Sequence, residues 1–118
     1  MHWTLAIVST GNVPEDGCLI GVCSIHIESP EYLNASIGYI INKPYWGKGY
    51  ATEATQGMVK FAFNTQGLHR VWATCRPDNL ASAAVLRKAG MQEEGLLRHH
   101  VLIRGQWHDS LLFAIINQ

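Results

Sequence analysis

Residues 39–54, YIINKPYWGKGYATEA, combine the end of an apolar strand, a glycine-containing turn and the start of a helical pattern. The first N–H groups of a helix have no partner within the helix, and the helix dipole favours negative charge there. Gly47 and Gly49 carry no Cβ, so a ligand can approach the backbone closely. The segment therefore predicts a phosphate-binding turn. A G-x-G turn also occurs without a ligand, so this motif alone does not identify a site.

Composition predicts one folded domain over residues 1–118, a length too short for two. Hydrophobic residues make up 47% of the chain and charged residues 15%, which argues against disorder. Nine basic residues balance nine acidic ones, so no overall field attracts nucleic acid or anionic lipid. No apolar run approaches the roughly 20 residues that span a bilayer, and the three cysteines lack metal-site spacing. We expect a cytoplasmic protein with no metal site and neither nucleic acid nor membrane as partner.

The hydrophobic periodicity predicts the element order ββ-β-α-β-α-ββ. Strands are expected at residues 3–7, 18–27, 35–41, 70–75, 96–104 and 107–116. Helices are expected at residues 51–65 and from a cap at Asp78 or Asn79 to Ala89, and Gly105-Gln106 is the expected hairpin turn. This order indicates an α/β (α+β) fold, a mixed sheet with helices on its faces.

Both predicted helices start at the same end of this sheet. A right-handed crossover sets the fourth strand parallel to the third, so each helix begins beyond the carboxyl end of one of these strands. Ligands of open α/β sheets bind at such a place. The first helix start carries the glycine turn with Lys48, which suits a pyrophosphate. The second carries Asn79 and Ser82, which offer an amide and a hydroxyl.

Taken together, the two helix starts resemble the coenzyme A site of the GNAT N-acetyltransferase superfamily. The turn WGKGYA at residues 46–51 is similar to its Q/R-x-x-G-x-G/A loop, and NLASAAVLRKAGM at residues 79–91 to its second acetyl-CoA element. The segments PYWGKGYATEA, GLHRVWATCRPDNLAS and GQWHDSLLFAI are similar to the RimJ/RimL-like subgroup, which includes ribosomal-protein alanine N-acetyltransferases. The resemblance covers residues 19–116 and implies a GNAT-like, mostly antiparallel twisted sheet.

Acetyl-CoA is the cofactor that this resemblance implies, with direct attack of an amine on the thioester. The resemblance implies that the pantetheine binds along the end of the third strand and that the pyrophosphate binds at the glycine turn. The sulfur would lie at the start of the second helix, and the nucleotide would contact one of two basic side chains on that helix. Backbone N–H groups of the strand would polarise the thioester carbonyl. The implied cofactor-binding residues are Tyr39, Ile40, Ile41, Trp46, Gly47, Lys48, Gly49, Tyr50, Ala51, Thr52, Asn79, Ser82, and Arg87 or Lys88. Trp46 stands where the family loop has glutamine or arginine.

Ser82 is the expected proton donor to the leaving thiolate. In many family members a tyrosine has this role, but its position here is Leu86. A serine is a weak acid, although a thiolate needs little help to leave.

The general base is expected at one of three acidic residues or at a histidine. The subgroup often has an acidic residue just before its I-G-Y motif, where this chain has Ser36. Glu31 is the expected base, and Glu28, His26 and Asp109 are the alternatives.

Compared with the family, the chain begins close to the second strand of the family fold. It lacks the usual N-terminal strand and the helices that form one wall of the acceptor site. We expect one of three situations: a partner subunit supplies the wall, the site is open, or the chain is a degenerate fragment. An exposed sheet edge would favour a homodimer.

Three functions are consistent with these features. The first is an acetyl-CoA-dependent N-acetyltransferase that acts on a protein N-terminus or a small-molecule amine. The alternative is a non-catalytic acyl-CoA-binding module. A dinucleotide binder fits less well, because the third glycine and the acidic residue of that motif are not both present. The pairs His99-His100 and His108-Asp109 do not offer a tetrahedral metal set and are expected on strand surfaces.

Overall fold

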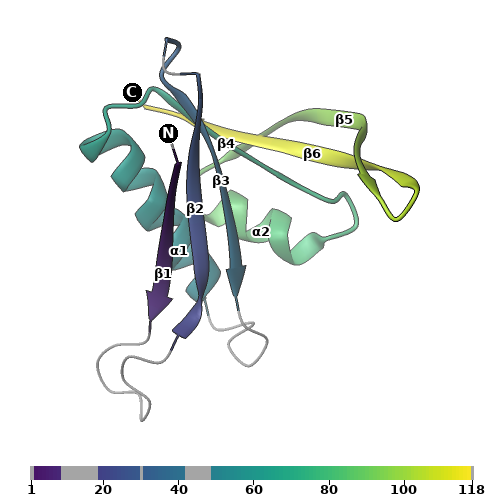
Figure 1. The fold of residues 1–118 in the computed structure, drawn as a ribbon, viewed down its shortest axis with the longest axis horizontal. Coiled ribbons are helices and arrows are strands. Elements are labelled where there is room, and N and C mark those ends of the chain that lie inside the picture. The colour runs from purple at the N-terminus through teal and green to yellow at the C-terminus, as the bar shows by residue number, and fades with distance from the viewer. Residues whose placement is uncertain (1, 9–18, 30, 42–48, 118) are drawn as a thin grey trace.

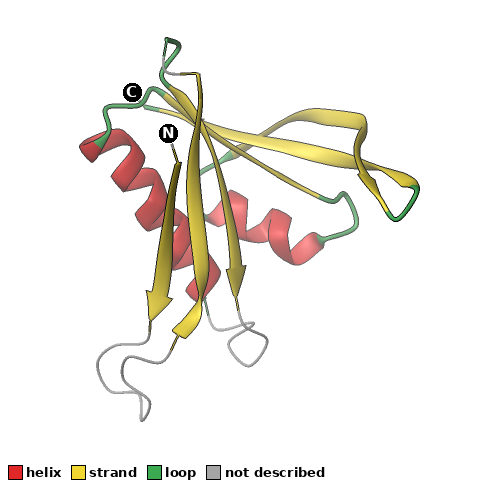
Figure 2. Ribbon diagram, in the orientation of Figure 1, coloured by secondary structure: helices red, strands yellow, loops and turns green. Residues whose placement is uncertain are grey.

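The computed structural model describes residues 2–8, 19–29, 31–41 and 49–117 (Figure 1). Its strands and helices follow the predicted order (Figure 2). The strands are β1 (His2–Val8), β2 (Leu19–Ser29), β3 (Asn34–Ile41), β4 (Arg70–Cys75), β5 (Gln92–Ile103) and β6 (Gln106–Ile116). The α-helices are α1 (Tyr50–Lys60) and α2 (Leu80–Lys88), and a π-helical segment, η2 (Phe61–Thr65), extends α1.

These strands form a six-stranded sheet in the order β1-β2-β3-β4-β6-β5. β3 and β4 are parallel, as the right-handed crossover through α1 requires. The other neighbouring pairs are antiparallel. The predicted fold class, a mixed and mostly antiparallel sheet with helices, is confirmed.

Both helices pack on the same face of the sheet. Along β4 the buried residues alternate with partly exposed ones, and Val71, Ala73 and Cys75 face the core. Met58 of α1 and Leu86 of α2 belong to the same core cluster. In Figure 1 both helices lie behind the strands. The opposite face, which we call the open face, therefore carries the alternate strand residues.

The two parallel strands pair over only three residues and then diverge. Asn34–Ser36 of β3 pair with Arg70–Trp72 of β4, and beyond that point each strand continues without the other (Figure 1). β3 stays paired with β2 as far as Ile41. Because alternate residues of a strand direct their N–H and C=O groups to opposite edges, part of the backbone of residues 37–41 faces the space beside β4.

The β5–β6 hairpin differs from the prediction in its turn and in its length. Ile103 pairs with Gln106, so the turn is Arg104-Gly105 and not Gly105-Gln106. Both turn residues have positive φ, 49° and 78°, as a type I′ turn requires. β5 also begins at Gln92 and not at residue 96. The register of β5 against β6 shifts between Glu93 and Gly95 and again between Leu97 and Val101. These shifts interrupt the alternating pattern from which a strand is predicted.

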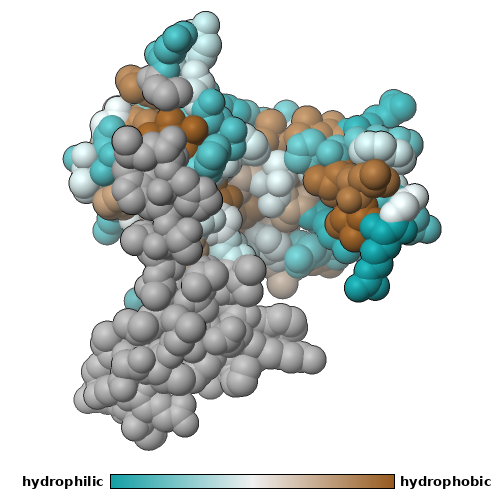
Figure 3. Space-filling view, in the orientation of Figure 1, coloured by the Kyte–Doolittle hydropathy of each residue, from teal (hydrophilic) through white to brown (hydrophobic). Residues whose placement is uncertain are grey.

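The far part of this hairpin extends beyond the helices. Figure 3 shows apolar side chains gathered over it, and Leu102 and Trp107 are 57% and 54% exposed. The Trp107 ring stacks on His99 with ring centroids 6.2 Å apart. These residues lie outside the core cluster.

Candidate functional site

A cavity of about 690 Å³ opens where β3 and β4 diverge. Cavities of this size are typical of cofactor and substrate pockets. The carboxyl-terminal parts of both strands, the first turn of α1 and one side of α2 along its length form its walls. The lining residues are Ile37, Gly38, Tyr39, Gly49, Tyr50, Ala51, Thr52, Ala73, Thr74, Asn79, Ala81, Ser82, Ala84, Val85, Leu86 and Lys88.

The start of α1 lies at this cavity. Gly49 is the N-cap residue, with φ 83° and ψ −1°, and no side chain of the described residues caps the helix. Its carbonyl accepts the Glu53 N–H at 3.0 Å, so the helical bonds begin there. A Cβ at Gly49 would meet no atom of the described residues within 4 Å. Glycine is therefore favoured here by its left-handed conformation, and an anion could approach the helix start here without contact to the described side chains.

A side chain does cap the start of α2. Of the two predicted caps, Asn79 is the N-cap residue, and its Oδ1 accepts the Ser82 N–H at 3.0 Å. The cap uses the amide oxygen. The amide NH₂ is therefore the group with which Asn79 would bond a ligand in the cavity.

Substitution of Asn79 should separate the cap from ligand binding. Asn79→Ala is expected to lose about 1 kcal/mol of unfolding free energy, while Asn79→Ser, which retains a capping oxygen, should lose only a few tenths. Both variants lack the amide NH₂, so both should bind coenzyme A about fivefold more weakly. Urea unfolding and calorimetry measure the two quantities. Wild-type affinity in Asn79→Ser would show that the amide does not contact the ligand.

Two hydroxyl groups meet in the cavity. The Tyr39 hydroxyl lies 3.3 Å from Ser82 Oγ, and the bond joins β3 to α2. Ser82 also interacts with the Cys75 thiol. Burial raises the pKa of that thiol and outweighs the opposing effects of Arg87 and Ser82, so Cys75 remains protonated. The sequence predicts a backbone contact for Tyr39 but not the hydrogen bond from its side chain to Ser82. Tyr39 lies on the same strand face as the buried Ala35 and Ile37, and this spacing was the available sign that its side chain points toward the helices.

Eight of the predicted cofactor-binding residues line the cavity: Tyr39, Gly49, Tyr50, Ala51, Thr52, Asn79, Ser82 and Lys88. Trp46, Gly47 and Lys48 lie outside the described residues. Ile40 and Ile41 belong to β3, where only their backbone is described.

The two candidate cations differ in position. Arg87 is directed away from the cavity, since its guanidinium bonds Glu93 Oε1 at 3.1 Å and lies 5.3 Å from the centre of the Phe113 ring. Of the pair Arg87 and Lys88, only Lys88 lines the cavity.

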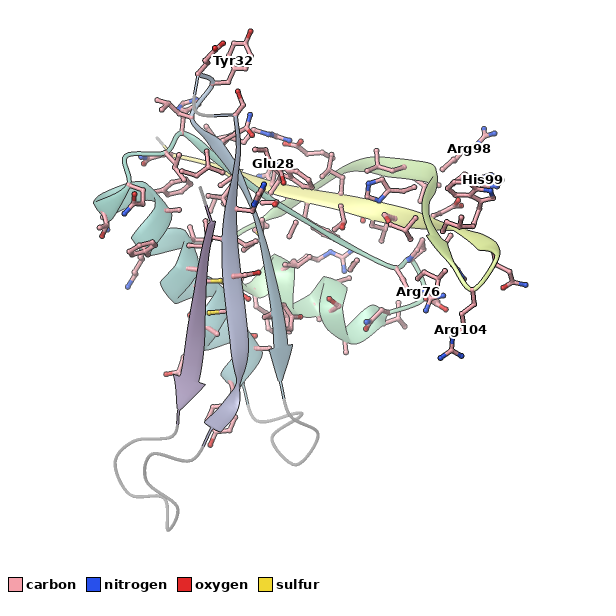
Figure 4. The ribbon with its side chains drawn as sticks, viewed as in Figure 1. Glu28, Tyr32, Arg76, Arg98, His99 and Arg104 are labelled. Atoms are coloured by element: carbon pink, nitrogen blue, oxygen red, sulfur yellow. The ribbon has the colours of Figure 1, made fainter. Side chains whose placement is uncertain are left out.

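Glu31, the expected base, lies far from this cavity. It occupies the exposed turn before β3, while the cavity adjoins the other end of the strand. The extended residues 34–37 add about 10 Å between this turn and Ile37, the first residue of β3 that lines the cavity. Tyr32, its neighbour, projects from that turn in Figure 4.

Glu28, one of the alternatives, reaches the point where the strands diverge. Its carboxylate accepts a hydrogen bond from Ser36 Oγ at 2.8 Å, and Ser36 belongs to the last β3–β4 pair before the cavity. Glu28 sits at a β-bulge, because Ile27 pairs with Ala35 and Ser29 with the adjacent residue. Figure 4 shows Glu28 beside the crossing of these strands.

Other polar side chains near this region have partners. Asp109 Oδ1 accepts the His99 N–H at 2.9 Å on the hairpin. Arg70 bonds both carboxylate oxygens of Glu94, at 2.6 and 3.0 Å. This hydrogen bonding lowers the pKa of Glu94 and raises that of Arg70. His26 is an exposed residue opposite Ser36.

The histidines of the hairpin bond single side chains. His100 Nδ1 lies 2.9 Å from Ser110 Oγ, and His108 Nδ1 lies 2.8 Å from an Arg76 nitrogen. In the part of the chain that the structure describes, no three His, Cys, Asp or Glu residues gather as metal ligands would. None of the described helices is long and apolar enough to cross a membrane.

Comparison with known proteins connects this cavity to a family. The model of the GNAT acetyltransferase domain matches residues 1–92. The chain belongs to the GNAT acetyltransferase family. The sequence-based assignment is thereby confirmed.

Three relatives show the similarity within this family. Probable N-acetyltransferase YjcK of Bacillus subtilis is 43% identical over 103 residues, with 86% of this chain and 57% of YjcK covered. [Ribosomal protein uS5]-alanine N-acetyltransferase of Escherichia coli is 31% identical, with 86% and 53% covered. The structure of Mycobacterium smegmatis RimJ in complex with CoA-disulfide is 35% identical with a TM-score of 0.82, and 96% of this chain and 53% of RimJ are covered. The similarity to the RimJ/RimL-like subgroup is thus confirmed, and this chain spans less than two thirds of each of these relatives.

Proposed function

We propose that this GNAT-family protein transfers the acetyl group of acetyl-CoA to a primary amine. The observation that carries the proposal is that two helix starts and the part of β3 that does not pair with β4 adjoin one cavity. Anionic, amide and thioester groups occur in this order along acetyl-CoA. The cavity lining includes a candidate partner for each of them.

The phosphate end would bind at the start of α1. Its first-turn N–H groups, which include those of Ala51 and Thr52, have no side-chain cap among the described residues, and the helix dipole favours negative charge there. Lys88 adds a cation to the same cavity. The pantetheine amides would then pair with the backbone of residues 37–41, which does not pair with β4. The CoA ligand of the RimJ relative supports this choice of substrate.

The amine would approach from the open face. There, Glu28 would accept a proton from the amine, and the amine nitrogen would form a bond to the thioester carbon. An N–H group of β3 would stabilise the negative charge that develops on the carbonyl oxygen. The C–S bond would break with its electron pair on sulfur, which we place beside Ser82. The acceptor is either a protein N-terminus, as the name of the uS5-alanine relative suggests for that enzyme, or a small-molecule amine.

Acetyl transfer can be measured directly. The protein is incubated with acetyl-CoA and with peptides that begin with alanine, and separately with polyamines. Release of the free thiol and the mass of one added acetyl group on the acceptor report the reaction. We expect both signals with at least one acceptor class, and neither signal without protein.

A different result would favour the acyl-CoA-binding module. Calorimetry with acetyl-CoA gives affinity independently of turnover. Tight binding combined with no acetylated product on any acceptor would overturn the proposed enzyme and leave only the binding function. Absence of binding would overturn the assignment of the cavity itself.

A further inference from the structure

The hydroxyl groups of Tyr39 and Ser82 form a pair within the cavity. Tyr39 comes from β3 and Ser82 from the first turn of α2, and their oxygens lie 3.3 Å apart. Both residues line the cavity and both are partly buried. The pair thus lies where the wall formed by β3 meets the wall formed by α2.

The α2 wall itself offers no acid beside Ser82. Ala81, Ala84, Val85 and Leu86 also line the cavity from this helix, and none of them carries a transferable proton. Lys88, the remaining α2 residue of the lining, lies in the last turn of the helix, away from Ser82 in its first turn. The nearby Cys75 thiol is buried at 9% exposure, and its pKa is raised. A phenol is a far stronger acid than an aliphatic alcohol. Tyr39 is therefore the described residue bonded to Ser82 that is best able to release a proton.

We propose that Tyr39 supplies, through the Ser82 hydroxyl, the proton that the coenzyme A thiolate takes up as it leaves. This inference rests on the proposed acetyl transfer. As the C–S bond breaks, the Ser82 O–H gives its proton to sulfur while the Tyr39 O–H gives its proton to Ser82 Oγ. The Tyr39 phenolate then regains a proton from water. Tyr39 thus acts through Ser82: it positions the Ser82 hydroxyl and replaces the proton that this hydroxyl gives up.

Substitution at both positions tests the relay. Tyr39→Phe is expected to lower kcat with acetyl-CoA by about 100-fold and to leave KM for acetyl-CoA within a factor of about two. Ser82→Ala should cause a similar loss, and the double variant should lose little more, because the two groups act in one step. Tyr32→Phe is the matched control, since Tyr32 is 75% exposed in the turn before β3. Thermal unfolding checks that each variant remains folded.

Two further readouts distinguish proton supply from packing. With an acetyl thioester of a much more acidic thiol, the leaving group needs no proton, so the loss in Tyr39→Phe should shrink to within about threefold. Site-specific 3-fluorotyrosine at position 39 is a stronger acid, and it should move the alkaline limb of kcat to lower pH. A wild-type kcat in Tyr39→Phe would overturn the relay. It would also be overturned if Tyr39→Phe lost the same factor in kcat with both thioesters and 3-fluorotyrosine left the alkaline limb of kcat at its wild-type pH. Failure of the wild-type protein to acetylate any amine would instead overturn the proposed function.

Discussion

Gly49→Asp is expected to weaken coenzyme A binding by about 100-fold, which corresponds to about 2.7 kcal/mol. Gly49 is the N-cap residue of α1, where the first N–H groups have no side-chain cap among the described residues. An aspartate at this position would bring its carboxylate to the helix N-terminus, where the helix dipole favours negative charge. The same carboxylate would repel a bound pyrophosphate. The variant should therefore stay folded while it loses its ligand.

Gly49→Asn is the matched control for this variant. Asparagine and aspartate have nearly the same shape, and both tolerate the left-handed conformation that Gly49 adopts at φ 83°. We expect Gly49→Asn to bind coenzyme A within about tenfold of the wild type, because it lacks the charge. Calorimetry with pantetheine, which has no pyrophosphate, should give equal affinities for both variants. Equal coenzyme A affinities for the two variants would show that no anion binds at the start of α1.

The positions of the two helix starts could be predicted from the sequence because they depend on residues that are close together in the chain. The glycine turn before α1 and the Asn79 cap of α2 each involve only a few consecutive residues. The predicted helix at residues 51–65 corresponds to α1 and η2, which begin one residue earlier and end at Thr65. The parallel pairing of β3 and β4 follows from crossover handedness. Local chemistry and chain topology together thus placed both helix starts at one end of the sheet.

Side-chain contacts between distant residues were not accessible in this way. Tyr39 and Ser82 are 43 positions apart, and their bond depends on how α2 packs against β3. The contact from Glu28 to Ser36 depends on the register of β2 and β3, which shifts between Ile27 and Ser29. A hydrophobic pattern of period two does not locate such a bulge. The base candidates near β3 could therefore be named from the sequence, but the choice among them could not.

The hairpin shows the same limit on a smaller scale. A turn at Arg104-Gly105 differs by one residue from a turn at Gly105-Gln106, and both contain the glycine that the pattern predicts. The difference changes the partner of every residue along β5 and β6. It leaves the candidate site unaffected, because no residue of this hairpin lines the cavity.

Glu28→Gln is the second variant with a large expected effect, a loss of about 100-fold in kcat/KM at neutral pH. The glutamine retains the shape of the side chain and a hydrogen-bond acceptor for Ser36 Oγ, but it cannot take a proton from the amine. An amine is mostly protonated at neutral pH and loses its proton to water as the pH rises. The deficit should therefore shrink toward high pH, where the acceptor arrives already neutral.

Two controls separate proton removal from other effects at this position. Glu31→Gln changes the same functional group in the exposed turn before β3, and should keep wild-type rates at every pH. Ser36→Ala removes the bond that orients the Glu28 carboxylate, and a loss of only about fivefold is expected, since one hydrogen bond contributes about 1 kcal/mol. A Glu28→Gln deficit that is independent of pH, or one confined to KM for the amine, would assign the carboxylate to binding of the ammonium group. The pH profile of this one variant therefore decides whether the bulge in β2 places a base or a binding charge at the point where β3 and β4 diverge.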